Sequence, residues 1–530
     1  MASRVEISKR LLFINSASSI AAQVLQFSVL VWLHQHLLRR VSADEYSLYP
    51  LVMAIVGFVP LFTMVLTSGL GRYLVDAYAR GDDERVSRIV SSMVPPLFVV
   101  GGLLLAVGGL VAWFVDRILV IPPQLIGDAR LMMFLLFFSL AVQLPCGPMG
   151  LGLYVRQKFV MANLIQVCSE VTKSVVLLSL LLLVSTRVMW VVVAMVAAQM
   201  FALVVNLMAS LRAIPALRFR YRPVQWDLVR AITGFGGWNF LVALAARTRE
   251  YATPLILNHL GSAIDIASYQ IGAMGRRQVD QWFDVAARPI HPIITGMHAM
   301  GAKERFRNAY LWGGRVGAWV ILAVSLPAII YSGPVISLYA GETYAAGAIV
   351  MSLTLAGYIL SSGNWMAWCI SAAKAQMRPL GIRACLTQAV GVVAILVLAG
   401  WWGLGAMGAA MASFVVLALS DVLLTLPLAL RLAEVRLETW IEKTLIPGLA
   451  PGCVAAVVWV YLERVVVPDT WTEVGLCVAA GALCYVAVLL GCCLGPQDKQ
   501  DLAMIWAKAA GRLRRGKTVP SDGPPDVATR

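Results

Sequence analysis

Long apolar stretches follow one another along the chain, with short polar segments between them. A helix needs about 20 mostly apolar residues to cross a lipid bilayer. Fourteen segments meet or approach this length. They cover residues 11–33, 46–70, 91–115, 129–151, 161–183, 188–211, 231–260, 265–297, 308–332, 346–371, 383–402, 404–431, 446–463 and 473–495. The pattern predicts an all-α polytopic membrane protein with about 14 transmembrane helices.

Two of these segments, 231–260 and 265–297, are weak on hydropathy because each carries several charges. Omitting both would leave a polar stretch of about 75 residues, and structureless loops of that length are uncommon inside a compact domain. We therefore count both as membrane helices, and their charges need a separate explanation.

Composition agrees with a membrane protein. The chain is 60% hydrophobic and 13% charged, with a formal net charge of +15. An ordinary soluble domain is roughly half apolar and about a quarter charged. These values exclude a soluble globular enzyme and a disordered protein. The positive charge does not indicate a nucleic-acid partner, because no soluble region is large enough to carry a basic binding face.

The basic residues are distributed unevenly across the predicted membrane. With the N-terminus on the cytoplasmic side, 30 of the 43 Lys and Arg residues fall in cytoplasmic segments, 6 in external segments and 7 within the spans. Membrane proteins carry such an excess of Lys and Arg on the cytoplasmic side. The count predicts a multi-pass protein with both termini in the cytoplasm.

An internal repeat divides the chain. Ala79-x-Gly81-x-x-Glu84-Arg85 recurs 220 residues later, beginning at Ala299, and Tyr49 and Tyr269 are related by the same offset. Six helices per copy would give both copies the same orientation, as in transporters whose site lies between parallel repeats. The predicted units are a six-helix lobe (1–211), a basic cytoplasmic linker (212–230), a second six-helix lobe (231–431), two extra helices (432–495) and a basic, disordered cytoplasmic tail (496–530).

Charged residues inside the spans indicate a binding site. Four charges of segment 265–297 recur at steps of three and four, which places them on one helix face. Within segments 231–260 and 265–297, and apart from Asp265 at the outer edge, basic residues outnumber acids by five to three. One interpretation is self-neutralising ion pairs that only fix packing, as for Glu170 with Lys173. The other is a cationic, water-filled cavity between the halves that binds phosphate, for which the planar, permanently charged Arg is well suited.

The candidate residues form two groups. The substrate-binding candidates are Arg247, Arg249, Arg276, Arg277, Arg288, Lys173 and Arg315. The candidates for charge balance or ion coupling are Glu250, Asp280, Asp284 and Glu170. The four charges on one face of segment 265–297 are Arg277, Asp280, Asp284 and Arg288.

Other motifs do not indicate catalysis or a cofactor. The segment from Gly511 to Thr518 matches the phosphate-loop spacing, but it lacks the preceding strand and following helix that such a loop needs. Contact of this polybasic tail with inner-leaflet lipids is the better interpretation. The nine Cys residues form no CxxC motif, and we expect neither a metal site nor a disulfide framework.

Several short motifs carry a family resemblance. They are the acidic, Tyr-containing entry at 44–49, the loop at 79–82, the Gly-Glu-x-Tyr stretch within 338–348 and the glycine-rich turn at 403–410. Together they resemble the polysaccharide flippases of the multidrug/oligosaccharidyl-lipid/polysaccharide (MOP) exporter superfamily. Leu48 and Ser268 stand where that family usually has Gly before the Tyr.

The resemblance implies a transporter of the bacterial inner membrane and not an enzyme. Its substrate would be an undecaprenyl-pyrophosphate-linked oligosaccharide for polysaccharide biosynthesis and export, flipped to the periplasmic leaflet by alternating access. Coupling to H⁺ or Na⁺ and contact with polysaccharide polymerase or export machinery would fit this role. The alternatives are a cation-coupled multidrug exporter of the same fold, a membrane glycosyltransferase, and a scaffold of an export complex.

Overall fold

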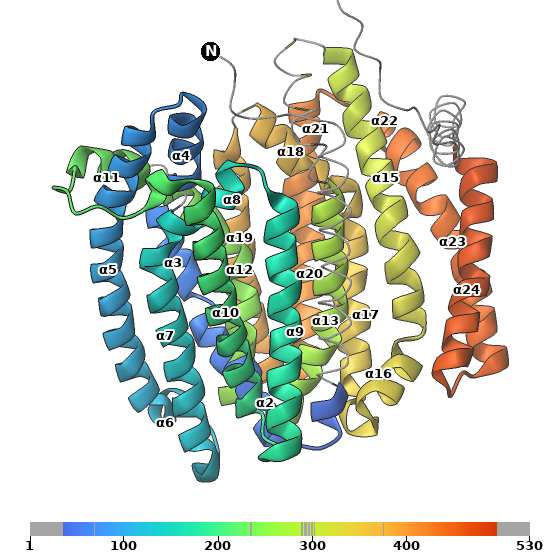
Figure 1. Ribbon diagram of the computed structural model, residues 1–530. Helices are drawn as coiled ribbons and strands as arrows, with labels where there is room; N and C mark the ends of the chain where they lie inside the picture. Colours follow the sequence, from blue (N-terminus) through green and yellow to red (C-terminus); the bar gives the residue numbers. More distant parts are fainter. Residues whose placement is uncertain are drawn as a thin grey trace, which may run out of the picture.

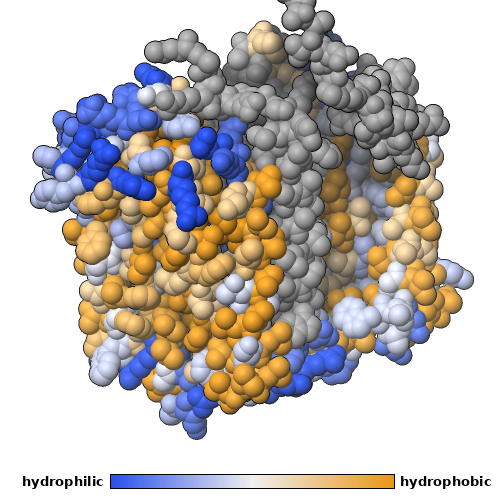
Figure 2. All heavy atoms as spheres, in the orientation of Figure 1, coloured by the Kyte–Doolittle hydropathy of each residue, from blue (hydrophilic) through white to orange (hydrophobic). Residues whose placement is uncertain are grey.

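The computed structural model describes residues 35–67, 69–233, 236–287, 303–374 and 376–494, and the single positions 290, 294, 297 and 300. Every regular element in this part of the chain is a helix. Most helices lie side by side, nearly parallel to one another (Figure 1). The face seen in Figure 2 carries a broad hydrophobic band with hydrophilic residues above and below it.

The described residues of the first half form long helices joined by shorter ones. They are α2 (Ala43–Val56), α3 (Val59–Thr67), α4 (Leu70–Ala79), α5 (Asp83–Trp113), α6 (Val115–Ile118), α7 (Ile126–Gly150), α8 (Gly152–Val155), α9 (Phe159–Leu183) and α10 (Met189–Ala213), with short turns η1 (Pro123–Leu125) and η2 (Pro215–Leu217). The short helix α11 (Trp226–Thr233) follows in the predicted inter-lobe linker and beyond it.

The second half begins at α12 and repeats a similar order. Its elements are α12 (Gly236–Leu260), α13 (Ala263–Ala287), α15 (Lys303–Ile330), α16 (Ser332–Ala340), η3 (Glu342–Tyr344), α17 (Ala346–Ser361), η4 (Ser362–Asn364), α18 (Met366–Ala373), α19 (Met377–Ile395), η5 (Leu396–Trp401), α20 (Gly405–Ser420), η6 (Asp421–Thr425) and α21 (Leu426–Ala433). The last elements are α22 (Leu437–Trp440), η7 (Ile441–Leu445), α23 (Ile446–Val466), α24 (Trp471–Val488) and η8 (Leu489–Cys493).

Eleven helical segments in the described part of the chain are long and apolar enough to cross a membrane. The weak segments 231–260 and 265–297 are also helical, as α12 and α13, although their charges keep them outside that set. The predicted span 11–33 lies outside the described residues. The chain is therefore an all-α polytopic membrane protein, and this prediction of the fold class is confirmed.

The 220-residue offset relates helix starts as well as motifs. Helix α2 begins at residue 43 and α13 at 263, α5 at 83 and α15 at 303, and α7 at 126 and α17 at 346. The N-caps match too, because Ser42 accepts a hydrogen bond from the Glu45 backbone N–H and Ser262 accepts one from the Asp265 N–H. Side-chain oxygens of this kind satisfy the otherwise unpaired first turn of a helix. These matches support the predicted lobe boundaries, which stay a prediction.

Each matched acid also ties its helix to a distant one. Glu45 accepts a hydrogen bond from the Val188 N–H at the start of α10, at 2.9 Å, and Asp265 accepts one from the Ala406 N–H in α20, at 2.8 Å. Gly405 makes the second contact possible. Its φ is +48°, and a Cβ there would lie 2.2 Å from an Asp265 carboxylate oxygen.

The two halves meet through a few helices. Helix α2 packs against α12 and α13, and α3 packs against α12. Gly57 allows the close approach of α2 and α12, because a Cβ at this position would lie 2.5 Å from the Tyr251 ring. The neighbouring ring of Phe58 meets Tyr251 edge-on, with centroids 5.2 Å apart. The pair α23 and α24 lies at the outer edge of the second half, where α23 packs against α15 (Figure 1).

Candidate functional site

Two neighbouring hollows in the second half of the chain share the side chains of Arg249 and Arg276. The larger has a volume of about 790 Å³ and is lined by residues between Arg249 and Thr425. Its walls come from α12, α13, α15 and the helices from α17 to η6. We call the two hollows together the cationic cavity. Its volume falls within the roughly 300–1,000 Å³ that is typical of ligand sites.

Helix α13 directs one face into the cationic cavity. The lining residues of this helix include Tyr269, Ala273, Arg276, Asp280 and Phe283. They follow one another at steps of four and three, the spacing of side chains on one helix face. Arg277, where the predicted face began, also lines the smaller hollow, and Asp280 belongs to both the predicted and the observed face.

Arg277 turns instead toward an ion-pair cluster. Its guanidinium lies 3.8 Å from the Glu250 carboxylate and also donates to the Gln270 side chain and backbone oxygen, at 3.2 and 2.9 Å. Arg247 donates to the other oxygen of Glu250 at 2.7 Å. One carboxylate is thus shared between two arginines, and the cluster as a whole keeps a positive charge.

Arg249 and Arg276 differ from this cluster. Among the described residues, neither makes an ion pair or a side-chain hydrogen bond, and the buried Nη1 atom of Arg249 has no hydrogen-bond partner there. Buried polar groups are normally paired, and an unpaired buried charge costs more than a neutral group. Two cations that line one cavity also repel each other. An anion in the cavity would relieve both costs.

Arg383, another arginine of the cavity, is held by an ion pair and a hydrogen bond. Arg383 in α19 forms an ion pair with Asp421 at 3.1 Å and donates to the Ser420 hydroxyl at 3.1 Å. Thr425 donates to the same Asp421 oxygen at 2.7 Å, and Ser361 donates to the other oxygen. Asp421 opens the π-helical segment η6, which interrupts the continuous helix from α20 to α21. Such π-turns often occur at functional sites.

Arg383 and Asp421 were not among the predicted site residues. Arg383 lies at the edge of the eleventh predicted span and counted with the preceding loop, whereas α19 begins at Met377 and places Arg383 almost two turns inside the helix. The signal that could have found this pair was Asp421 itself. An acid within an apolar span is expected to have a basic partner on a neighbouring helix.

Aromatic side chains form the remaining wall of the cationic cavity. Phe283 and Trp365 meet edge-on with ring centroids 5.2 Å apart, and Trp368 and Tyr358 also line the space. Asn364 adds an amide. An apolar cavity with a few fixed polar and charged groups is typical of a small-molecule site.

Other predicted residues lie elsewhere. Lys173 forms an ion pair with Glu170 within α9, and neither lines the cationic cavity. The guanidinium of Arg315 lies 5.1 Å from the centre of the Trp319 ring, on the part of α15 that packs against α23. Asp280 lines the cavity and is exposed. Arg288 and the side chain of Asp284 lie outside the described residues.

The position of the cavity also differs from the expectation. The prediction was a cavity between the two halves, but the residues that line it all come from α12 to η6, within the second half. Adjacent residues point about 100° apart on a helix with 3.6 residues per turn, so Arg276 borders both hollows while Arg277 borders only the smaller one, beside Glu250.

No grouping of three or more His, Cys, Asp or Glu side chains in the described ranges could hold a metal ion. No protein-family model matches the chain. A curated relative, the "Uncharacterized membrane protein EpsK" of Bacillus subtilis (strain 168), is 22% identical over 514 residues, which cover 94% of this chain and 99% of EpsK.

Solved structures are similar over most of the chain. The lipid II flippase MurJ in an inward closed conformation has a TM-score of 0.65 at 11% identity and covers 90% of this chain and 98% of its own. An inward-facing multidrug resistance MATE family transporter of the MOP superfamily has a TM-score of 0.62 at 12% identity, with coverage of 78% and 98%. The MATE transporter VcmN of Vibrio cholerae, as a mutant, has a TM-score of 0.58 at 13% identity, with coverage of 80% and 98%.

These likenesses define the class of protein at the level of its fold. The chain is a multi-pass membrane protein with the fold of the MOP superfamily, to which its structural neighbours MurJ and the MATE transporters belong. The family resemblance carried by the sequence motifs is confirmed at this level.

Proposed function

We propose that the chain is a flippase that moves a polyprenyl-pyrophosphate-linked oligosaccharide across the bacterial inner membrane. The observation that carries this proposal is the pair of cavity arginines, Arg249 and Arg276, neither of which forms an ion pair or a side-chain hydrogen bond with a described residue. Arginine binds phosphate through charge-assisted, often bidentate hydrogen bonds. A pyrophosphate would supply the negative charge that this pair lacks.

Further support comes from the fold and the cavity walls. One structural neighbour is named as a flippase of lipid II. The aromatic side chains of Trp368 and Tyr358 beside the arginines would suit the first sugar of a head group. In this proposal both termini lie in the cytoplasm, and the cavity takes its substrate from that side while the polyprenyl chain stays in the lipid.

The proposal also assigns the acids. Within the described part of the chain, Glu250 and Asp421 already form ion pairs, whereas Asp280 lines the cavity without one. Asp280 is therefore the candidate carrier of a coupling H⁺ or Na⁺, if transport uses an ion gradient. Glu250 and Asp421 would hold arginines in place.

The test is export by Arg249→Gln and Arg276→Gln variants in cells that need the chain for their surface polysaccharide. We expect surface polysaccharide to fall at least tenfold and the lipid-linked precursor to accumulate in the inner leaflet, because a lost charge-assisted contact is worth roughly 1.5–3 kcal/mol and each 1.4 kcal/mol is about tenfold. Arg436→Gln is the matched control, since Arg436 is exposed and does not line the cavity. Normal export by both cavity variants would refute the proposal.

A second candidate is a multidrug exporter, favoured by the aromatic wall of the cavity and by the exposed Asp280, a combination that suits a cationic drug. Loss of the gene would then raise drug susceptibility without affecting surface polysaccharide. A susceptibility panel in a deletion strain separates the two functions.

A further inference from the structure

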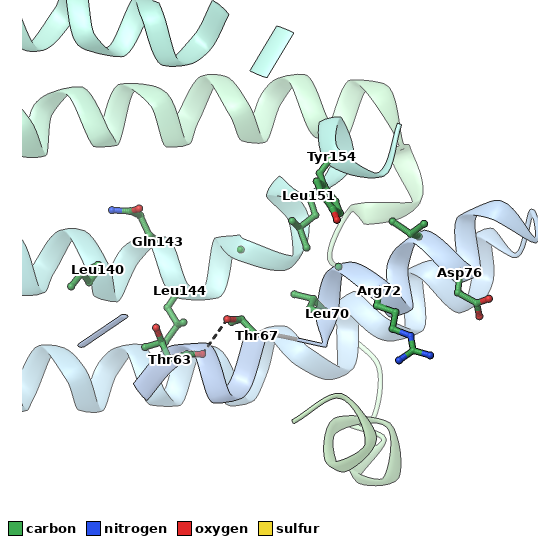
Figure 3. A pocket seen from close by; sticks show the side chains of 13 residues that line it. Thr63, Thr67, Leu70, Arg72, Asp76, Leu140, Gln143, Leu144, Leu151 and Tyr154 are labelled. Carbon is green, nitrogen blue, oxygen red and sulfur yellow. Dashed lines mark hydrogen bonds between the residues drawn. The ribbon is translucent and has the colours of Figure 1, made fainter. Parts of the chain in front are cut away.

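A second large cavity lies in the first half of the chain. It has a volume of about 1,000 Å³ and lies between α3 and α4 on one side and α7 and α8 on the other (Figure 3). We call it the N-terminal cavity. It shares no lining residue with the cationic cavity.

The lining of the N-terminal cavity combines several apolar side chains with a few polar ones. Thr63 and Thr67 on α3 contribute hydroxyl groups, and Gln143 on α7 contributes an amide (Figure 3). The charged residues of the lining are Arg72 and Asp76 on α4, and Asp76 forms an ion pair with Arg80 at 2.8 Å. The lining thus holds one arginine, whereas the lining of the cationic cavity holds four.

The polar groups have hydrogen-bonding capacity to spare. The two threonine hydroxyls donate to backbone oxygens, at 3.1 Å each, which leaves their oxygens able to accept. The Gln143 amide donates to Ser139 at 2.8 Å and to Gln199 at 3.4 Å, and these bonds fix its orientation. No described residue donates to its carbonyl oxygen.

An aromatic face completes the cavity. Tyr154 in α8 lines it and its side chain is 52% exposed. Fixed acceptors together with an exposed aromatic ring match the chemistry of a sugar, which presents hydroxyl donors at its edge and C–H groups on its face. A fatty or polyprenyl chain has no donors for the acceptor oxygens of Thr63, Thr67 and Gln143.

The position of the N-terminal cavity relates it to the cationic cavity. Thr63 and Thr67 belong to α3, and α3 packs against α12, which carries Arg249. The two cavities lie near the same end of the molecule. This end carries α4 and α8 beside the N-terminal cavity and α18 and α21 beside the cationic cavity (Figure 1). One extended head group could therefore reach both when the contact between α3 and α12 opens.

We propose that the N-terminal cavity binds the sugars of the transported head group, while Arg249 and Arg276 bind its pyrophosphate. This inference rests on the proposed function and deepens it. It assigns glycan recognition to the first half of the chain and phosphate recognition to the second. A substrate without sugars would then depend on the second half alone.

The test fills the N-terminal cavity from its own wall. Gly147 in α7 lines the cavity, and a Cβ at this position would meet no atom within 4 Å, so Gly147→Phe adds a ring in open space. Gly102→Phe in α5 is the matched control, because a Cβ there also meets nothing and Gly102 is exposed and lines neither cavity. Gly147→Ala adds a single methyl group and is expected to behave as the unsubstituted protein.

Binding is measured with two probes on the full-length protein in nanodiscs. One probe is undecaprenyl pyrophosphate without sugar, and the other is the lipid-linked oligosaccharide fraction extracted from the host's own membranes. We expect Gly147→Phe to weaken binding of the oligosaccharide probe at least tenfold and binding of the sugar-free probe less than twofold. Arg249→Gln should weaken binding of both probes.

The outcomes separate the two proposals. If Gly147→Phe binds both probes as the unsubstituted protein does, or loses both equally, the sugar assignment is overturned while the flippase function stands. If the unsubstituted protein binds neither probe, the proposed function itself fails. If Gly102→Phe loses the oligosaccharide probe as strongly as Gly147→Phe, the effect does not come from the cavity and the assignment fails as well.

Discussion

Arg249 is the residue at which function and stability oppose each other most directly. Its buried Nη1 atom finds no hydrogen-bond partner in the described residues, and Arg276 lines the same cavity. Leaving a buried donor unsatisfied costs about 1–3 kcal/mol, and more for a charged group. We expect Arg249→Met to raise the melting temperature of the purified, substrate-free protein by an amount equivalent to about 1–3 kcal/mol, while export is lost.

Arg277→Met is the control for this prediction, because Arg277 is a nearby arginine that does have partners. It would remove the 3.8 Å contact with Glu250 and both bonds to Gln270. Its melting temperature should therefore fall. The interpretation of Arg249 as an unpaired cation is wrong if both substitutions lower the melting temperature by the same amount in a thermal denaturation series.

At the residue scale, the sequence predicted the kind of site better than its members. The surplus of Arg within segments 231–260 and 265–297 indicated a cationic cavity, and Arg249 and Arg276 do line one. Sequence spacing places Arg247 and Glu250 one turn apart, but it could not show that Arg277 would also reach Glu250, because that contact depends on how α12 and α13 face each other. It likewise places Arg315 and Trp319 on one face of α15, but it could not show that this part of α15 packs against α23.

At the scale of elements, the sequence predicted helices that hydropathy alone would reject. Helices α12 and α13 each run for 25 residues in the structure despite their charges. A hydropathy scale assigns every charged residue a free-energy cost of entering the membrane, but in the folded protein ion pairs and a polar cavity offset that cost. The length of the loop that would otherwise remain predicted these two helices better than hydropathy did. The interior breaks at η5 and η6 were not predicted, since a π-turn keeps the apolar pattern and changes only the hydrogen bonds.

The prediction at the scale of elements concerns the ion pair between Asp421, the first residue of η6, and Arg383. Asp421→Asn would keep the shape of the side chain and remove the charge that Arg383 faces at 3.1 Å. Breaking a buried ion pair by removing one partner costs about 3–5 kcal/mol. We expect the Asp421→Asn protein to lose stability in this range in a denaturant or thermal unfolding series.

The double variant Arg383→Gln with Asp421→Asn should regain much of this loss, because neither charge is then left alone. A double-mutant cycle measures the coupling between the two sites. Additive losses in the cycle would mean that η6 is held by its other bonds, from Thr425 and Ser361 to Asp421, and not by the ion pair.

At the scale of the whole molecule, a reciprocal pair of hydrogen bonds joins the two halves at the end opposite the cavities, and we call this pair the clasp. The Val120 N–H donates to the Asn258 amide oxygen at 2.8 Å, and the Asn258 NH₂ group donates back to the Val120 carbonyl oxygen at 2.8 Å. Val120 follows α6 in the first half, and Asn258 lies near the end of α12 in the second. For a transporter that works by alternating access, this clasp has to open when the cavities turn to the other side of the membrane.

Asn258→Ala should therefore shift the protein toward the state that opens at this end. Two hydrogen bonds worth about 0.5–1.5 kcal/mol each would change the ratio of open to closed molecules by roughly tenfold. Spin labels at Ile118→Cys and Leu260→Cys, in a background without the native cysteines, would report a longer and broader distance. Asn206→Ala is the matched control, because the Asn206 amide bonds to the Gly150 carbonyl oxygen within the first half. An unchanged distance in Asn258→Ala would mean that the contact between α2 and α12, including Tyr251 against Gly57, holds this end closed without the clasp.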